Sequence, residues 1–144
     1  MRLSTRTIQE LHREINSRTI AGFGFSPSVK IGTFTRDTTI ASGTQAIPGI
    51  GFKPKVVLFF AVDNATLEVS AMGFDDGSNK GNLFFSVGTL NWQRTGNNSI
   101  TDSEGIGTNY VGNISTMDVD GFTISWTRNG APTGTINIDY CALR

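Results

Sequence analysis

The chain has 144 residues, of which 38% are hydrophobic and only 17% charged. This length fits one domain with a real core. The low charge and the 17 glycines favour an all-β domain with many turns over a helical or disordered chain. Twelve basic and twelve acidic side chains cancel, which gives no general attraction to nucleic acid.

Two further absences in the composition limit the chemistry. Cys141 is the only cysteine, so neither an internal disulfide nor a thiolate metal cluster can form. The N-terminus lacks the apolar core of a signal peptide, and no stretch approaches the roughly 18 apolar residues of a spanning helix. We therefore expect a soluble protein made in a cytoplasm, with no membrane partner.

Residues 1–27 form the first predicted unit, an arm with a short helix. Ile8, Leu11 and Ile15 follow the i, i+3, i+7 spacing of one helical stripe. A helix of about ten residues is too short to be stable alone, so its stripe must pack on another surface. The glycines and proline of Ala21–Pro27 predict a connector between this arm and the rest of the chain.

The charge is unevenly distributed along the sequence. Residues 1–30 carry five basic and two acidic side chains, or +3, so the remainder carries −3. A basic arm on a slightly acidic body suits docking onto an acidic protein surface, although a merely solvated helix gives the same pattern. The candidate partner-binding residues of the arm are Arg2, Arg6, Ile8, Leu11, Arg13 and Ile15.

Residues 28–144 form the predicted body, in which the apolar pattern changes to a period of two. Strands are expected near residues 29–33, 55–62, 66–74, 82–88, 108–117, 121–127 and 134–143, with a short one around Trp92. Seven or eight short strands with regular turns predict a single antiparallel β-sandwich, jelly-roll-like, with the helical arm attached.

Particular stretches of the body carry more detailed predictions. The unbroken apolar run Lys55–Val62 predicts a strand buried on both faces. Residues 88–113 predict a long loop, in which Trp92 is the best candidate for an exposed binding contact. Cys141 is expected to be a small buried hydrophobe. Inward-facing side chains are expected from the last two strands: Phe122, Ile124, Trp126, Ile136, Ile138, Tyr140 and Ala142.

The segment Met117–Trp126 (MDVDGFTISW) resembles a metal loop or a catalytic acid pair at first sight. An EF-hand register on its glycine places Thr116 and Thr127 at the first and last ligand positions, where carboxylates are required. A carboxylate pair for glycoside hydrolysis stays open, but a hairpin turn accounts for the pattern more simply. A less regular calcium site also stays open, with candidates Asp75, Asp76, Asp118 and Asp120.

Nucleophilic catalysis and phosphate binding find little support. His12, the only histidine, lies in the arm, and no G-x-S-x-G elbow occurs. Pro27 stands where a dinucleotide fingerprint needs its third glycine. The sequence therefore predicts no enzyme, no cofactor and no catalytic or metal site.

Three stretches together resemble small β-sandwich virion structural proteins of tailed bacteriophages, of the capsid decoration (cement) or tail and fibre type. The first is Gly49–Phe60, where Gly51, Phe52, Pro54 and Val57 match a GF-x-P-x-x-V strand. The second is the D-x-D-G-F-T hairpin at Asp118–Thr123. The third is the final strand ending in Y-x-A-L, with Tyr140, Ala142 and Leu143. The likeness spans about residues 29–144 and leaves out the arm.

This resemblance implies a non-enzymatic protein of the virion, assembled in the host cytoplasm. The expected function is capsid decoration, in which the protein binds the head lattice and stabilises it. Its expected partners are the major capsid protein or another virion protein, and further copies of itself, with a trimer favoured. The alternative is a lectin-like tail or fibre domain that binds host carbohydrate through Trp92 and its polar neighbours Asn91, Gln93 and Asn97.

Overall fold

A computed structural model describes residues 29–64 and 70–144, and these residues form ten β-strands. The strands are β1 (Val29–Asp37), β2 (Gly43–Pro48), β3 (Val56–Asp63), β4 (Ser70–Asp75), β5 (Lys80–Ser86), β6 (Asn91–Thr95), β7 (Ile100–Gly105), β8 (Thr108–Asp118), β9 (Gly121–Asn129) and β10 (Thr135–Leu143). The described part of the chain is therefore all-β, as predicted. It contains no helix long and apolar enough to cross a membrane.

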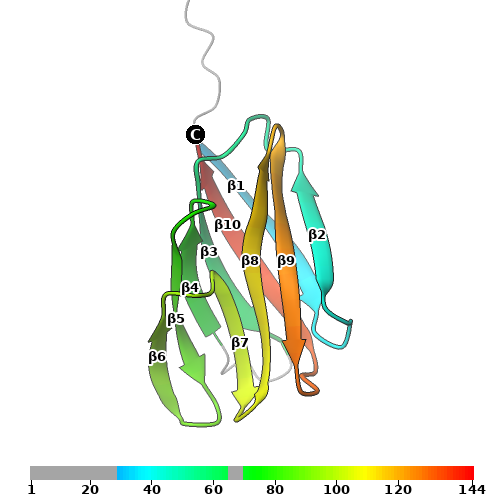
Figure 1. Ribbon diagram of the computed structural model, residues 1–144, viewed down its shortest axis with the longest axis vertical. Coiled ribbons are helices and arrows are strands. Elements are labelled where there is room, and N and C mark those ends of the chain that lie inside the picture. The colour runs from blue at the N-terminus through cyan, green and yellow to red at the C-terminus, as the bar shows by residue number, and fades with distance from the viewer. Residues whose placement is uncertain (1–28, 65–69) are drawn as a thin grey trace, which may run out of the picture.

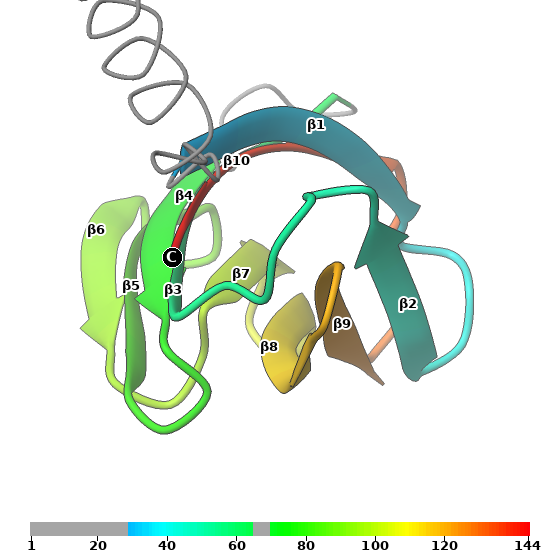
Figure 2. The ribbon, with the colours of Figure 1, turned by 90° about the horizontal axis from the view of Figure 1, so that it is seen from above.

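The strands form two antiparallel sheets that face each other. One sheet has six strands in the order β1-β10-β3-β4-β5-β6, and the other has four in the order β2-β9-β8-β7. The larger sheet curves over the smaller one (Figures 1 and 2). β7 lies against β3, β4 and β5, so the two sheets approach each other closely on that side.

The hydrophobic core fills the space between the sheets and follows the alternation of the strands. Phe122 of β9 lies near its centre, with its ring 5.4 Å from that of Tyr140 and 5.8 Å from that of Phe59. Side chains at alternate positions of a strand point to one face, so β3, β9 and β10 contribute every second residue to this core. The inward positions expected on the last two strands are all buried: Phe122, Ile124, Trp126, Ile136, Ile138, Tyr140 and Ala142.

Gly112, which has no side chain, makes room for Trp126, the largest residue of the core. Trp126 is 1% exposed and lies directly opposite Gly112 in the β8–β9 pair. A Cβ atom at position 112 would lie 2.5 Å from the indole ring, far inside van der Waals contact. The indole N–H is also satisfied, because it donates to Gln45 Oε1 at 3.1 Å. The glycine therefore serves close packing at this position.

Two strands were not predicted from the sequence. β2 occupies a segment for which no strand was expected, and β7 lies within the predicted loop at 88–113. β6 confirms the short strand expected around Trp92. The expectation of one long loop was therefore wrong. The sequence of β7, ITDSEG, is polar, yet its first four residues are all buried. Its strand pattern was missed because buried positions are usually apolar. Here Thr101 and Ser103 are polar, and they hydrogen-bond to Asn82 and Ser86 of the facing sheet.

The predicted burial of two segments also needs correction. β3 is a central strand, but only one of its faces lies in the core, since Phe60 is 47% and Val62 41% exposed. Cys141 is half-buried on the outer face of β10 rather than in the core. The predicted helix and connector of residues 1–27 lie outside the described residues.

Candidate functional site

The outer face of the six-stranded sheet carries large exposed apolar side chains on four adjacent strands. These residues, here called the outer apolar face, are Phe60, Val62, Met72, Phe74, Leu83 and Trp92. Each is between 41% and 56% exposed. Soluble monomers rarely expose contiguous apolar patches of such a kind, so this face is a candidate interaction surface.

The sheet register places these side chains next to one another. Phe60 of β3 lies opposite Met72 of β4, and Met72 lies opposite Leu83 of β5. Directly paired residues have Cβ atoms about 4.5–5.5 Å apart, so the three side chains form one row across the sheet. The continuous apolar run of β3 therefore serves two purposes, because its odd positions build the core and its even positions build this face.

Trp92 extends the outer apolar face onto the edge strand β6. It is 56% exposed and packs edge-to-face on Phe85 of β5, with the ring centroids 5.7 Å apart. The sequence correctly singled it out as exposed, and β6 is the short strand expected around it. Beside it a hollow of about 280 Å³ is lined by apolar residues and by Asn137 and Asp139 of β10.

The polar neighbours that the sequence grouped with Trp92 do not surround it. Asn91 and Gln93 alternate with Trp92 along β6, so their side chains point to the opposite face of the sheet. Gln93 donates to Thr89 Oγ1 at 2.7 Å and lines a separate polar hollow of about 330 Å³ between the sheets. The predicted four-residue patch is therefore divided between two faces.

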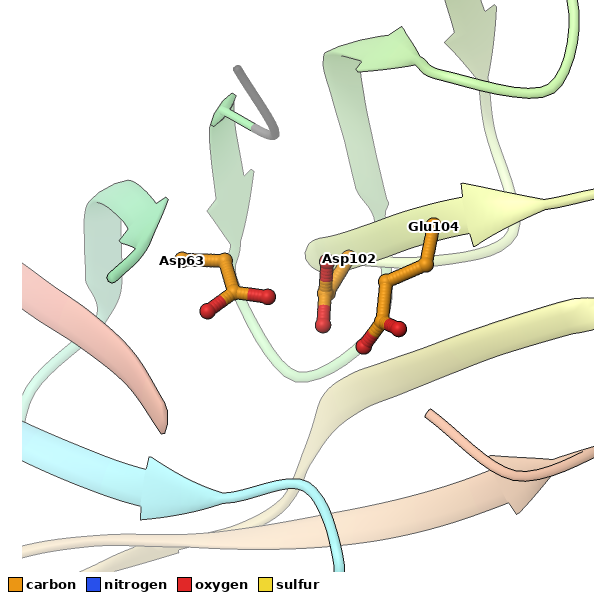
Figure 3. Close-up of side chains that lie close together, drawn as sticks. All are labelled: Asp63, Asp102 and Glu104. Carbon is orange, nitrogen blue, oxygen red and sulfur yellow. The ribbon is translucent and has the colours of Figure 1, made fainter. Parts of the chain in front are cut away.

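A second candidate site is a cluster of three carboxylates at one end of the molecule (Figure 3). Asp63 ends β3, while Asp102 and Glu104 lie on β7, whose pairing with β8 shifts register between Ser103 and Gly105. An oxygen atom from each lies within 4.8 Å of the others. We call Asp63, Asp102 and Glu104 the acidic cluster.

The electrostatics of the acidic cluster centre on Asp102. Its side chain is 2% exposed, and neither carboxylate oxygen accepts a hydrogen bond from the part of the chain that the structure describes. Burial, followed by the charges of Asp63 and Glu104, raises the pKa of Asp102 from 3.8 to about 8. Two carboxylates so close to a buried third disfavour the ionised form of Asp102.

The first two acids that the sequence proposed as calcium ligands, Asp75 and Asp76, accept hydrogen bonds from other parts of the protein. Asp75 accepts hydrogen bonds from Ser99 Oγ and from the backbone N–H of Ile114, which ties β4 to the facing sheet. Asp76 accepts the backbone N–H and the side-chain amide of Asn79, and then the backbone N–H of Ser78, and these bonds lower its pKa. Asp75 therefore links the two sheets, and Asp76 stabilises a turn.

The hairpin acids Asp118 and Asp120 also serve separate structural roles. Asp118 accepts the hydroxyl groups of Thr116 and Thr123 at 2.9 and 2.8 Å, within its own hairpin. Asp120 accepts the backbone N–H of Gly51 at 2.5 Å and that of Gly49 at 3.3 Å. The turn interpretation is therefore confirmed. Asp120 also hydrogen-bonds the first stretch of the phage resemblance, Gly49–Phe60, to the hairpin of the second, Asp118–Thr123.

No protein-family model matches this chain, and no curated protein or solved structure matches it either. The resemblance to virion structural proteins therefore stays a prediction from the sequence. Of the candidate partner-binding residues, only Trp92 falls within the described residues. The arm positions Arg2, Arg6, Ile8, Leu11, Arg13 and Ile15 lie outside them.

Sequence reasoning missed both the acidic cluster and most of the outer apolar face. The signal for the cluster was the D-x-E spacing of Asp102 and Glu104, which two-residue periodicity would place on one face. It passed unnoticed because the segment was assigned to a loop. Asp63 could not be joined to the pair from the sequence, since 38 positions separate Asp63 from Asp102.

Proposed function

We propose that this protein is a non-enzymatic structural protein of a phage virion, a capsid decoration protein that binds the head lattice in many copies. The observation that carries the proposal is the outer apolar face, an exposed apolar row on one side of a rigid sheet. Such a row gains free energy when another protein surface covers it, at about 25 cal/mol per Å² of apolar area. The resemblance of the three sequence motifs supplies the virion context.

Two further features support assembly as the role of the protein. β1 and β6 are edge strands of the six-stranded sheet, so their outer edges are available for pairing or packing. Closed oligomers bury such faces and edges, and we propose a homotrimer. The outer face of β1 adds Ile31, which is 73% exposed, at the end of the sheet where the chain enters.

The arm supplies a second contact in this proposal. Its predicted stripe of Ile8, Leu11 and Ile15 needs an apolar surface, and its arginines suit an acidic partner. Two tethered contacts bind more tightly than either alone, because the second becomes intramolecular. The arm would therefore raise lattice affinity without a larger interface for each copy.

The experiment is co-sedimentation of the purified full chain with expanded, undecorated capsids. We expect stoichiometric binding that is weakened by deletion of residues 1–27 and lost in Met72→Lys, which places a charge in the apolar row. Val119→Lys is the matched control, since Val119 is an exposed apolar residue of the β8–β9 turn and is 85% exposed. Absence of capsid binding by the folded wild-type chain would sink the proposal.

The second candidate function is a lectin-like tail or fibre domain. The hollow beside Trp92 favours it, because an exposed indole next to Asn137 and Asp139 can stack on a sugar ring and bond to its hydroxyl groups. A glycan array separates the two candidates. Glycan binding that is lost in Trp92→Ala, without capsid binding, would support the lectin and contradict the decoration protein.

A further inference from the structure

We propose that the acidic cluster of Asp63, Asp102 and Glu104 is a binding site for a hard divalent cation, with Ca²⁺ as the preferred occupant. The site is independent of the outer apolar face and of the proposed virion role. It joins the end of β3 to the middle of β7, and so links the two sheets at one end of the molecule.

The geometry supplies three carboxylate ligands at the spacing that one ion requires. All three carboxylates offer an oxygen within 4.8 Å of the others. Figure 3 shows them side by side, with Asp63 facing the β7 pair. Ligands at about 2.3–2.6 Å from a common Ca²⁺ ion lie within about 5 Å of one another, so small side-chain rotations suffice to close the site.

The unsatisfied oxygens of Asp102 are the second observation that points to a ligand. A buried polar atom without a partner costs about 1–3 kcal/mol, so folded proteins rarely leave one. Here both oxygens of one carboxylate are buried, and neither accepts a hydrogen bond from any described residue. A bound cation would satisfy both the missing contacts and the concentrated negative charge.

Glu104 is held in place for this role by the loop before β10. Its Oε1 accepts the backbone N–H of Thr133 at 2.6 Å, and the Thr133 hydroxyl lies 3.3 Å from Oε2. These contacts fix the carboxylate and leave it further ligand capacity, because each oxygen has two lone pairs. Glu104 is only half-buried, so an ion can enter from its side.

The ligand set determines the class of metal. Three carboxylates without histidine or cysteine suit hard cations such as Ca²⁺ or Mg²⁺ and disfavour zinc or copper. Ca²⁺ accepts irregular geometry and several protein oxygens, whereas Mg²⁺ demands near-octahedral geometry and keeps more of its waters. Two arginines of the described strands β1 and β9 have partners outside the acidic cluster. Arg36 donates to Tyr110 Oη and Arg128 donates to the carbonyl oxygen of Thr38.

The test is isothermal titration of the chelator-treated full chain with CaCl₂, and separately with MgCl₂, together with thermal unfolding. We expect one site per chain and a higher melting temperature with Ca²⁺, because a ligand that binds only the folded state stabilises it. Asp102→Asn and Glu104→Gln should each weaken Ca²⁺ binding by about tenfold or more. Asp118→Asn removes the same charge in a distant turn and should bind normally.

The two ligand variants keep the test informative if one of them folds poorly. Asp102→Asn should fold well without metal, since the amide removes the repulsion among the carboxylates. Terbium luminescence provides an independent signal, because Tyr110 lies opposite Asp102 in the β7–β8 pair and can sensitise a bound ion. Failure of both Ca²⁺ and Mg²⁺ to bind the folded chain overturns the proposal, as does Ca²⁺ binding that both variants retain.

Discussion

The two faces of the central strand β3 are both largely apolar, yet only one of them is covered. On β3 the inner residues Val57 and Phe59 are at most 1% exposed, whereas the outer residues Phe60 and Val62 are at least 41% exposed. The four-stranded sheet covers the inner face, and nothing in the described chain covers the outer one. Residue type alone therefore does not mark the core, because the same apolar side chains build a core or a contact surface.

The neighbouring residues Phe59 and Phe60 give the sharpest test of this difference. Phe59→Ala should destabilise the fold by about 3–5 kcal/mol, because it leaves a cavity beside Phe122. Phe60→Ala should cost less than about 1 kcal/mol in the isolated subunit, since its ring is half in solvent. Urea unfolding of both variants at low protein concentration measures the contrast. Equal losses would show that the outer face is covered in solution.

The buried acids Asp63 and Asp102 lie between the two sheets, and Asp102 predicts that the free energy of unfolding depends on pH when a chelator removes any metal. The pKa of Asp102 is 3.8 in the unfolded chain and about 8 in the fold. The folded state therefore binds one more proton at Asp102 between these values, so the contribution of Asp102 to stability is largest at low pH and falls until the pH reaches about 8. Urea unfolding across this range should show the slope, and Asp102→Asn should flatten it.

A smaller loss is expected where a glycine makes room inside the core. Gly112→Ala would place a Cβ atom 2.5 Å from the Trp126 ring and force it to move. Such overpacking costs about 1–3 kcal/mol. Gly96→Ala is the control, since no atom lies within 4 Å of the added Cβ there. Thermal unfolding of the pair should lower the midpoint only for the core position.

The smallest effect is expected at the hairpin turn, which belongs to neither face. Asp118→Asn loses charge-assisted bonds to Thr116 and Thr123 but keeps an acceptor oxygen, so we expect a loss of about 1 kcal/mol or less. Asp120→Asn should behave similarly. Binding to capsids should be unchanged in both. A calcium-dependent rise in melting temperature that these changes abolish would instead place a metal in the turn.

The pattern of the sequence predicted the regular strands because alternation is a local property. β9 and β10 point apolar side chains inward at every second position, and these inward faces were identified correctly. β7 escaped prediction because its buried residues are polar. Asn82 donates to Thr101 Oγ1 at 2.9 Å across the sheets, so burial there does not require an apolar side chain.

By itself the sequence determined the all-β class, the core faces of the late strands and the turn at Asp118–Gly121, since each depends on neighbouring residues. The tertiary structure decided which face of β3 is covered and which acids meet. Those outcomes depend on pairing between strands far apart in the chain, such as β3 with β10 and β7 against β5. Local periodicity fixes which residues share a face, and only the packing of whole sheets decides what each face meets.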